Sequence, residues 1–144
     1  MAISMADIQK LRKMTGAGMM DCKSALTEAN GDFDKAIDII RKKGQAFAAK
    51  REDRDATEGC GLAATSGDFA AIVAVNCETD FVAINGDFVG MTKSILDAAV
   101  ANKPADMDTL KTLKVGDRTV AELVTDRMGV TGEKMELNVY EQIT

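Results

Sequence analysis

The spacing of apolar residues first changes near residue 55, and this change constrains the fold more than any other feature of the chain. Before it, apolar residues recur every three or four positions, which is typical of amphipathic helices. After it, the apolar run Phe69–Cys77 has the length and character of a central β-strand. A helical part followed by a part built on a sheet predicts the α+β class.

Three short helices are predicted in a first domain, residues 1–54. The first follows Ser4, and Asp7 stands where a capping box needs its acid. Gly16–Gly18 separates it from the second, which ends at Asn30–Gly31, and the third begins at Asp32. The apolar positions then fall on one face of each helix, which predicts a small bundle with its own core: Met5, Ile8, Leu11, Met14; Met19, Cys22, Ala25, Leu26, Ala29; and Phe33, Ala36, Ile37, Ile40, Phe47.

A second domain, residues 55–144, is predicted to carry a small antiparallel sheet with packed helices, after a boundary near residues 48–57. Residues 59–65 and 69–77 form a predicted hairpin, followed by helices at 87–101 and 119–128. Residues 135–143 alternate apolar and polar side chains and predict a strand. Because a strand edge needs cover, we expect a further element beyond it or a second copy of the chain in a homodimer.

The composition excludes several classes of function. The chain has no histidine, so histidine general bases, Ser-His-Asp triads and histidine metal sites are excluded, and no metal site or cofactor is predicted. Its three cysteines, Cys22, Cys60 and Cys77, are far apart and form no CxxC pair, which favours reduced thiols and a cytoplasmic location. No apolar run approaches the roughly 18 residues of a membrane helix. We therefore predict no association with a membrane.

Charge is concentrated in residues 41–54, which carry six basic and two acidic side chains. Such a block could bind nucleic acid, but it also fits a solvated helix end and linker. The whole chain has a net charge of −5. Because nucleic-acid-binding domains are usually basic, the second interpretation is favoured and nucleic acid is not an expected partner.

The segment from Gly16 to Ser24 invites comparison with phosphate-binding loops. Such a loop needs a glycine directly before its Lys-Ser pair and another five residues earlier, where this chain has Cys22 and Ala17. We therefore expect no direct nucleotide binding. The alternative is a glycine turn between two helices, with Met19 and Met20 packed or partly exposed.

The segment from Asn76 to Val82 places two carboxylates, a threonine and a large aromatic after the apolar strand. A strand-end loop of this kind can present one apolar anchor among polar groups, although Phe81 is by composition more often a core residue. Glu78 and Asp80 could form a general acid/base pair, but no histidine and no further ligand cluster is near in the sequence. An enzyme that uses Cys22 or Cys77 as nucleophile lacks a basic partner. The chain is therefore not expected to be an enzyme, and no catalytic residue is assigned.

Two long segments, in this order, resemble bacterial translation elongation factor Ts, the guanine-nucleotide exchange factor of the GTPase elongation factor Tu. Residues 11–26, LRKMTGAGMMDCKSAL, look like the N-terminal signature of that family, and residues 75–83, VNCETDFVA, look like its second signature. The resemblance implies that residues 1–54 form a module similar to ubiquitin-associated domains. It implies that the rest is the first half of the family's dimerisation core.

The resemblance also implies a partner and a mechanism. The module and the Thr-Asp-Phe tip would bind elongation factor Tu, and the tip would disturb its magnesium and phosphate sites so that GDP leaves. The implied tip residues are Asn76, Cys77, Glu78, Thr79, Asp80, Phe81 and Val82. The implied module residues are Leu11, Arg12, Thr15, Gly16, Ala17, Gly18, Met19, Met20, Asp21 and Lys23.

Two positions depart from the family pattern: Ala74, where many relatives have glutamate, and Ile84, where a basic residue is common. These substitutions bear on how the tip is presented. A module that binds proteins like a ubiquitin-associated domain, without exchange activity, is the alternative function.

Overall fold

The N-terminal part is a bundle of three helices. The structure, a computed structural model, describes residues 2–50 and 52–144. Helix α1 (Met5–Thr15) begins at the predicted capping box and ends at Gly16, whose φ of 74° suits glycine. It is followed by α2 (Met19–Glu28) and α3 (Phe33–Lys50). The three predicted helices are confirmed, and the third reaches Lys50.

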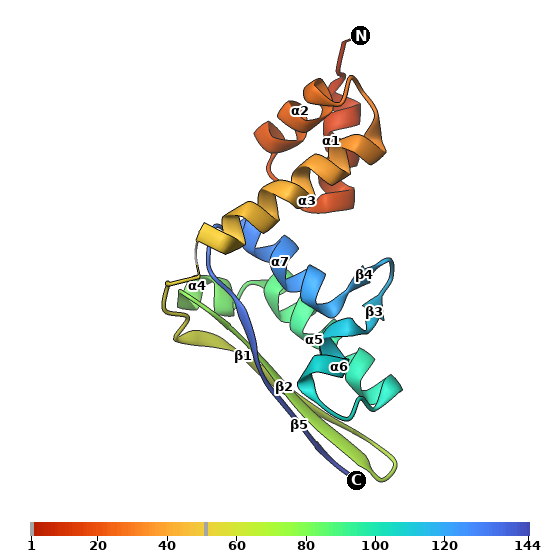
Figure 1. Cartoon of the computed structure of the whole chain (residues 1–144), viewed down its shortest axis with the longest axis vertical. Helices are drawn as coiled ribbons and strands as arrows, with labels where there is room; N and C mark the ends of the chain where they lie inside the picture. Colours follow the sequence, from red (N-terminus) through yellow and green to blue (C-terminus); the bar gives the residue numbers. More distant parts are fainter. Residues whose placement is uncertain (1, 51) are drawn as a thin grey trace.

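The second part contains a three-stranded antiparallel sheet in the order β1–β2–β5 (Figure 1). Its strands are β1 (Glu58–Ser66), β2 (Phe69–Cys77) and β5 (Glu136–Ile143). The predicted hairpin is confirmed, with Ser66 opposite Phe69 and a turn at Gly67, whose φ is 58°. The apolar run becomes the central strand, and the fold belongs to the predicted α+β class.

Helices cover one face of this sheet (Figure 1). The predicted pair is confirmed as α5 (Gly86–Asn102) and α7 (Val120–Thr131). Four short elements were not predicted: the helices α4 (Asp80–Ala83) and α6 (Met107–Thr112), and the two-residue strands β3 (Lys114–Val115) and β4 (Arg118–Thr119). Segments of two to six residues are too short to show a hydrophobic period.

Two separate hydrophobic clusters lie in the described residues. The first is confined to the helical module and joins Leu11, Cys22 and Leu26 with their neighbours. The second joins the sheet to α5 and α7, with Phe69, Phe88 and Ile95 among its fully buried side chains. Helix α3 contributes to both, because its first half packs in the module while Phe47 and Ala48 pack against the second cluster. The division at residues 54 and 55 remains a proposal.

The strand at the end of the chain is confirmed as β5, which pairs with β2 along one edge. Among the described residues, no strand pairs with its other edge. Ile72 of β2 and Ile143 of β5 are exposed, and the strand register places both on the face opposite the buried side chains of β2. Such a surface favours association, so the homodimer remains a prediction.

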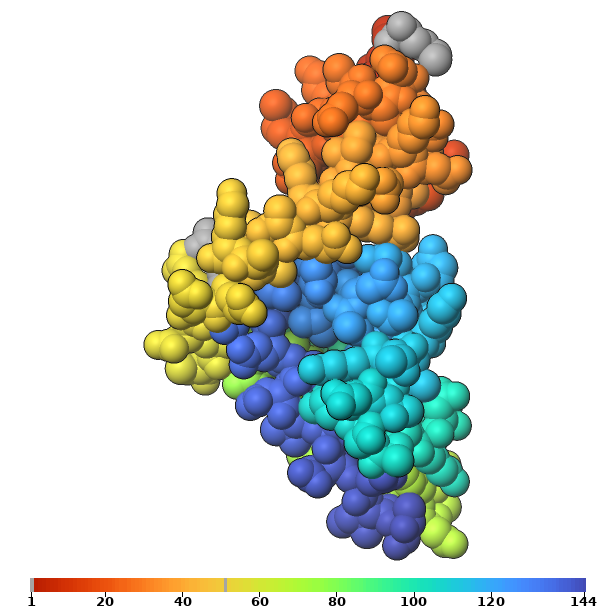
Figure 2. All heavy atoms as spheres, in the orientation of Figure 1, coloured from red at the N-terminus to blue at the C-terminus, as the bar shows by residue number. Residues whose placement is uncertain are grey.

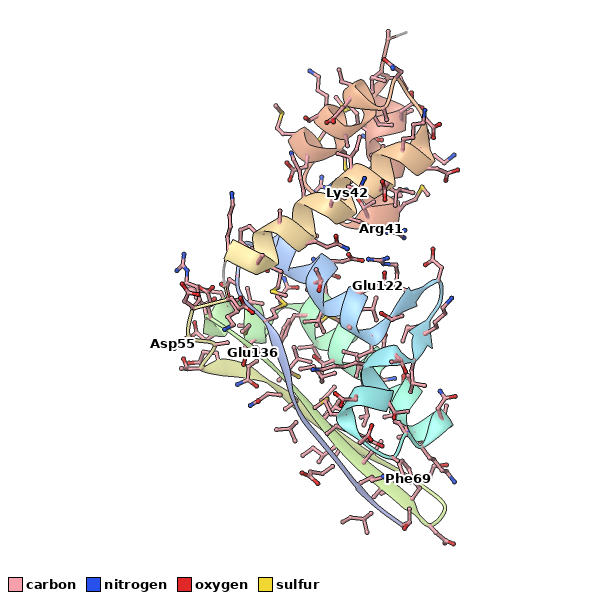
Figure 3. The ribbon with its side chains drawn as sticks, in the orientation of Figure 1. Arg41, Lys42, Asp55, Phe69, Glu122 and Glu136 are labelled. Atoms are coloured by element: carbon pink, nitrogen blue, oxygen red, sulfur yellow. The ribbon has the colours of Figure 1, made fainter. Side chains whose placement is uncertain are left out.

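Helix α3 packs across α7 (Figure 1), and in the space-filling view its second half lies directly against the rest of the molecule (Figure 2). Gly44 of α3 and Gly129 of α7 lie close together, and a Cβ built on Gly129 would lie 3.1 Å from the Cα of Gly44. Arg41 of α3 adds an ion pair of 3.8 Å with Asp117, on the side of α7 that carries Glu122 (Figure 3). These contacts of α3 therefore fix the orientation of the module relative to the rest of the molecule.

We expect Gly129→Leu to weaken this contact, because a side chain at this position must push the α3 backbone away. Overpacking of this kind typically costs about 1–3 kcal/mol of unfolding free energy. The matched control is Gly90→Leu in α5, where an added Cβ meets nothing within 4 Å. There the better helix former should stabilise the protein by up to about 1 kcal/mol. Equal stabilisation at both positions in urea titrations would show that the contact between α3 and α7 is slack.

Candidate functional site

A short helical tip follows the central strand of the sheet. Strand β2 ends at Cys77 and α4 begins at Asp80, so the tip lies at the end of the central strand (Figure 1). Phe81 is 81% exposed and Ile84 is 79% exposed. Residues three apart share one side of a helix, so the two side chains form one apolar surface. Because Phe81 lies outside the core, the tip can present it to a partner.

A single carboxylate holds the base of the tip. Glu133 Oε1 accepts hydrogen bonds from the backbone N–H groups of Glu78 at 3.1 Å and Thr79 at 2.9 Å. Its Oε2 accepts from the Thr79 hydroxyl at 2.5 Å. Glu78 Oε1 in turn accepts from the backbone N–H of Lys134 at 2.8 Å, and Arg54 lies 3.6 Å from the other oxygen. The two segments therefore hold each other through reciprocal charge-assisted hydrogen bonds.

The predicted tip residues divide into supporting and exposed groups. Cys77 is fully buried, and its thiol donates to the Thr79 carbonyl at 3.2 Å. Asn76 donates to the carbonyl of Ala56 at 3.2 Å, which ties the end of β2 to the segment before β1. Asp80 and Phe81 are exposed, and Val82 is half-buried against the core. The geometry gives Asn76, Cys77 and Glu78 internal contacts and leaves the Asp80–Phe81 end open.

The buried thiols are poorly suited to nucleophilic attack. Burial, followed by the nearby Glu133 carboxylate, raises the pKa of the Cys77 thiol to about 11. Burial also raises the pKa of Cys22, which is fully buried in the module. Because their pKa values are raised, both thiols stay protonated near neutral pH. The reactive form is the thiolate, so neither group is a ready nucleophile. These environments favour structural roles for both cysteines.

The predicted module residues lie at the turn between α1 and α2. Leu11 and Ala17 are buried in the module core. Thr15 is half-buried, and its hydroxyl accepts from the Ala17 N–H at 3.2 Å and donates to the Leu11 carbonyl at 2.8 Å. Met20 is 76% exposed at the start of α2. The exposed members of the set are Arg12, Gly16, Gly18, Met19, Met20, Asp21 and Lys23.

The two predicted groups do not form one pocket. A cleft of about 470 Å³ lies between the module and α7 and includes Thr15, Ala17 and Asp21 in its lining. No residue from 76 to 82 lines it. Helices α1 and α2 lie at one end of the molecule, whereas α4 lies near the C-terminal end of α3 (Figure 1). The arrangement offers two separate surfaces on one chain.

The basic block is largely paired with the chain's own acids. Lys42 contacts Asp38 at 3.1 Å and Lys43 contacts Asp21 at 3.7 Å. With the ion pairs of Arg41 and Arg54 described above, four cations of the block have carboxylate partners. Exposed pairs of this kind contribute little stability. They do reduce the positive field that a nucleic acid would meet.

Residues 2–50 and 52–144 hold no cluster of three or more acidic or cysteine side chains with the spacing to hold a metal ion. No helix in that part of the chain combines the length and hydropathy needed to cross a membrane.

Sequence reasoning missed two residues of the tip region. Glu133 lies 54 positions from Thr79, and no local pattern connects them. Ile84 was noted only as a departure from the family pattern, although it is exposed beside Phe81. A large apolar residue three positions after Phe81 was the available signal for Ile84.

Comparison with known proteins places the chain in a family. A family model described as elongation factor TS matches residues 78–144. Elongation factor Ts of Bacteroides thetaiotaomicron is 66% identical over 140 residues, 97% of this chain and 42% of that protein. The protein of the same name from Phocaeicola vulgatus is 64% identical, with 99% of this chain and 44% of that protein covered.

A third relative, elongation factor Ts of Porphyromonas gingivalis, is 61% identical and is covered over 53% of its length. The chain thus spans about half the length of the curated relatives it matches. Identity at this level over nearly all of its residues leaves no room for a chance match. The chain belongs to the elongation factor Ts family and corresponds to the N-terminal part of its longer relatives.

Proposed function

We propose that the chain acts in translation as a guanine-nucleotide exchange factor, which binds elongation factor Tu with GDP and promotes the release of GDP. The observation that carries this proposal is Phe81, which is 81% exposed on a helix whose Val82 and Ala83 pack against the core. A free protein gains nothing from leaving a phenylalanine in water, and an exposed aromatic with a rigid base is typical of a binding anchor. The names of the relatives support the role in translation.

The mechanism is differential binding. A factor that binds the GDP-bound and nucleotide-free GTPase equally cannot shift the equilibrium between them. The tip must therefore gain contacts as GDP leaves, when Phe81 enters a site beside the magnesium and phosphate sites of the partner. A thousandfold acceleration needs about 4 kcal/mol. Burial of a phenylalanine side chain supplies about 1.5–3 kcal/mol of this, and weakened metal contacts supply the rest.

The helical module supplies a second contact. Its exposed Met19 and Met20 are flexible apolar side chains that adapt to a partner surface. We assign it a fold similar to ubiquitin-associated domains and a role in affinity. No covalent chemistry is needed, so the chain is not an enzyme in the usual sense, needs no cofactor and acts in the cytoplasm with its partner. Asp80 needs no proton-transfer role.

The alternative function is binding without exchange. It is favoured by the module alone, which presents Met20 at 76% exposure and has its own hydrophobic cluster. In that case the chain binds a protein partner through α1 and α2, and the tip has no effect on nucleotide.

One experiment separates these functions. Release of a fluorescent GDP analogue from purified elongation factor Tu is followed with and without the chain, beside a direct binding measurement. Exchange activity predicts faster release at increasing concentrations of the chain, up to a maximum rate. Binding with no change in the release rate would establish the alternative, and the absence of both would contradict the proposal.

A further inference from the structure

The tip cannot hold its own orientation. Helix α4 has only four residues, and isolated helices of that length are not stable in water. Its N-cap residue, Thr79, makes no side-chain hydrogen bond to the helix. The Thr79 hydroxyl is directed to Glu133 instead. The direction in which α4 presents Phe81 therefore depends on groups outside the tip.

Glu133 is itself fixed by the end of α7. The helix ends at Gly132, whose φ of 76° turns the chain, and the Glu133 N–H then donates to the Thr131 hydroxyl at 3.3 Å. The carboxylate meets three donors, two backbone N–H groups and one hydroxyl, within 3.1 Å. An ionised carboxylate accepts through both oxygens, whereas an amide offers only one acceptor. The donor set therefore suits glutamate and not glutamine.

The same helix supports the module. Helix α7 packs against α3, so Glu133 stands at the end of the element on which the module rests. We infer that Glu133 is a positioning residue, an inference that rests on the function proposed above. Glu133 holds Thr79 so that Phe81 and the module together have the orientation that binding to the GTPase requires. Glu133 acts through Thr79 and itself makes no contact with the partner.

The test compares Glu133→Gln with Glu136→Gln in the full chain. The control removes a nearby carboxylate that pairs with Lys134 and not with the tip. The first readout is amide hydrogen exchange of Glu78 and Thr79 in the isolated chain. Loss of charge-assisted hydrogen bonds should speed it by about tenfold or more in Glu133→Gln and leave it unchanged in the control.

The second readout is release of GDP from elongation factor Tu. We expect Glu133→Gln to lower the maximum release rate by about fivefold to tenfold, with a smaller change in the half-saturating concentration, because the module still binds. Thr79→Val should add little to the Glu133→Gln defect, since both variants break one link. The control should release GDP at the unchanged rate.

Each outcome decides the proposal. Unchanged amide exchange in Glu133→Gln would overturn the inference, as would faster amide exchange with an unchanged maximum release rate. Additive defects in the double variant would show that Glu133 acts by another route. If the unmodified chain releases no GDP, the function proposed above fails, and the amide readout still decides whether Glu133 holds the tip. A urea titration shows that all variants are folded.

Discussion

Replacement of Phe81 by alanine should abolish most of the stimulation of GDP release while leaving the protein as stable as before. The side chain is 81% exposed, so its removal leaves no cavity in the core. Surface substitutions usually change the unfolding free energy by less than about 0.5 kcal/mol. A binding anchor, in contrast, typically contributes about 2 kcal/mol or more, which corresponds to about a thirtyfold loss of rate.

The matched control is Ile143→Ala. Ile143 is 73% exposed near the C-terminus, which lies at the far end of the sheet from α4 (Figure 1). It removes a comparable exposed apolar group without touching the tip, so GDP release should be unchanged. Affinity and maximum release rate are measured separately, because the module contact keeps part of the binding. If the unmodified chain is active and Phe81→Ala changes neither the affinity nor the maximum release rate, the proposed role of the tip is wrong.

A second apolar residue shares the exposed side of the tip. The sequence flagged Ile84 only because basic residues are common there, yet its side chain is 79% exposed beside Phe81. Compared with the family pattern, the residue replaces a charged group with an apolar one on the exposed side of the tip. In the mechanism proposed here, it widens the apolar contact that Phe81 begins.

The sequence predicted those elements whose pattern repeats over enough residues. The capping box at Ser4 and Asp7 correctly marked the start of α1, and the apolar run after Gly67 correctly marked the central strand. Both rest on local sequence: a side chain that caps nearby N–H groups, and a continuous apolar run of the length of a buried strand. Local signals of this kind suffice for most of the fold.

The missed parts depend on contacts between distant residues or on very short segments. The sequence predicts a loop where the structure has α4, because four residues show no period. The contact between Gly44 and Gly129 was also missed, since glycine inside a helix counts against helix formation by propensity alone. Its value comes from the approach of a second backbone, which only the assembled fold reveals. The link from Glu133 to Thr79 is of the same kind.

The two phenylalanines near the tip show that composition alone does not predict which of them is buried. Phe81 and Phe88 are one heptad apart, and composition alone favours the core for both. The structure buries Phe88 completely and exposes Phe81. The helical spacing of α5 correctly predicted the burial of Phe88, whereas Phe81 precedes that helix and follows different constraints.

Phe88→Ala should therefore have the opposite effect to Phe81→Ala. Phe88 is fully buried between α5 and the sheet, so truncation leaves a cavity and typically costs about 3–5 kcal/mol. That is a large share of the total stability of a domain of this size. The urea midpoint should fall steeply with an unchanged slope, and Phe88→Leu, which keeps most of the volume, should lose much less.

Phe88 also lies close to the tip in the chain. Phe88 lies in the first turn of α5, where its N–H donates to the capping Asn85 side chain at 3.3 Å, and α4 ends just before that cap. Loss of the buried ring should disturb this turn only in those molecules in which the whole domain unfolds. GDP release by Phe88→Ala should then fall in proportion to the folded fraction and recover on cooling toward the temperature of maximum stability. A loss of release in fully folded Phe88→Ala would mean that the ring also orients the tip directly.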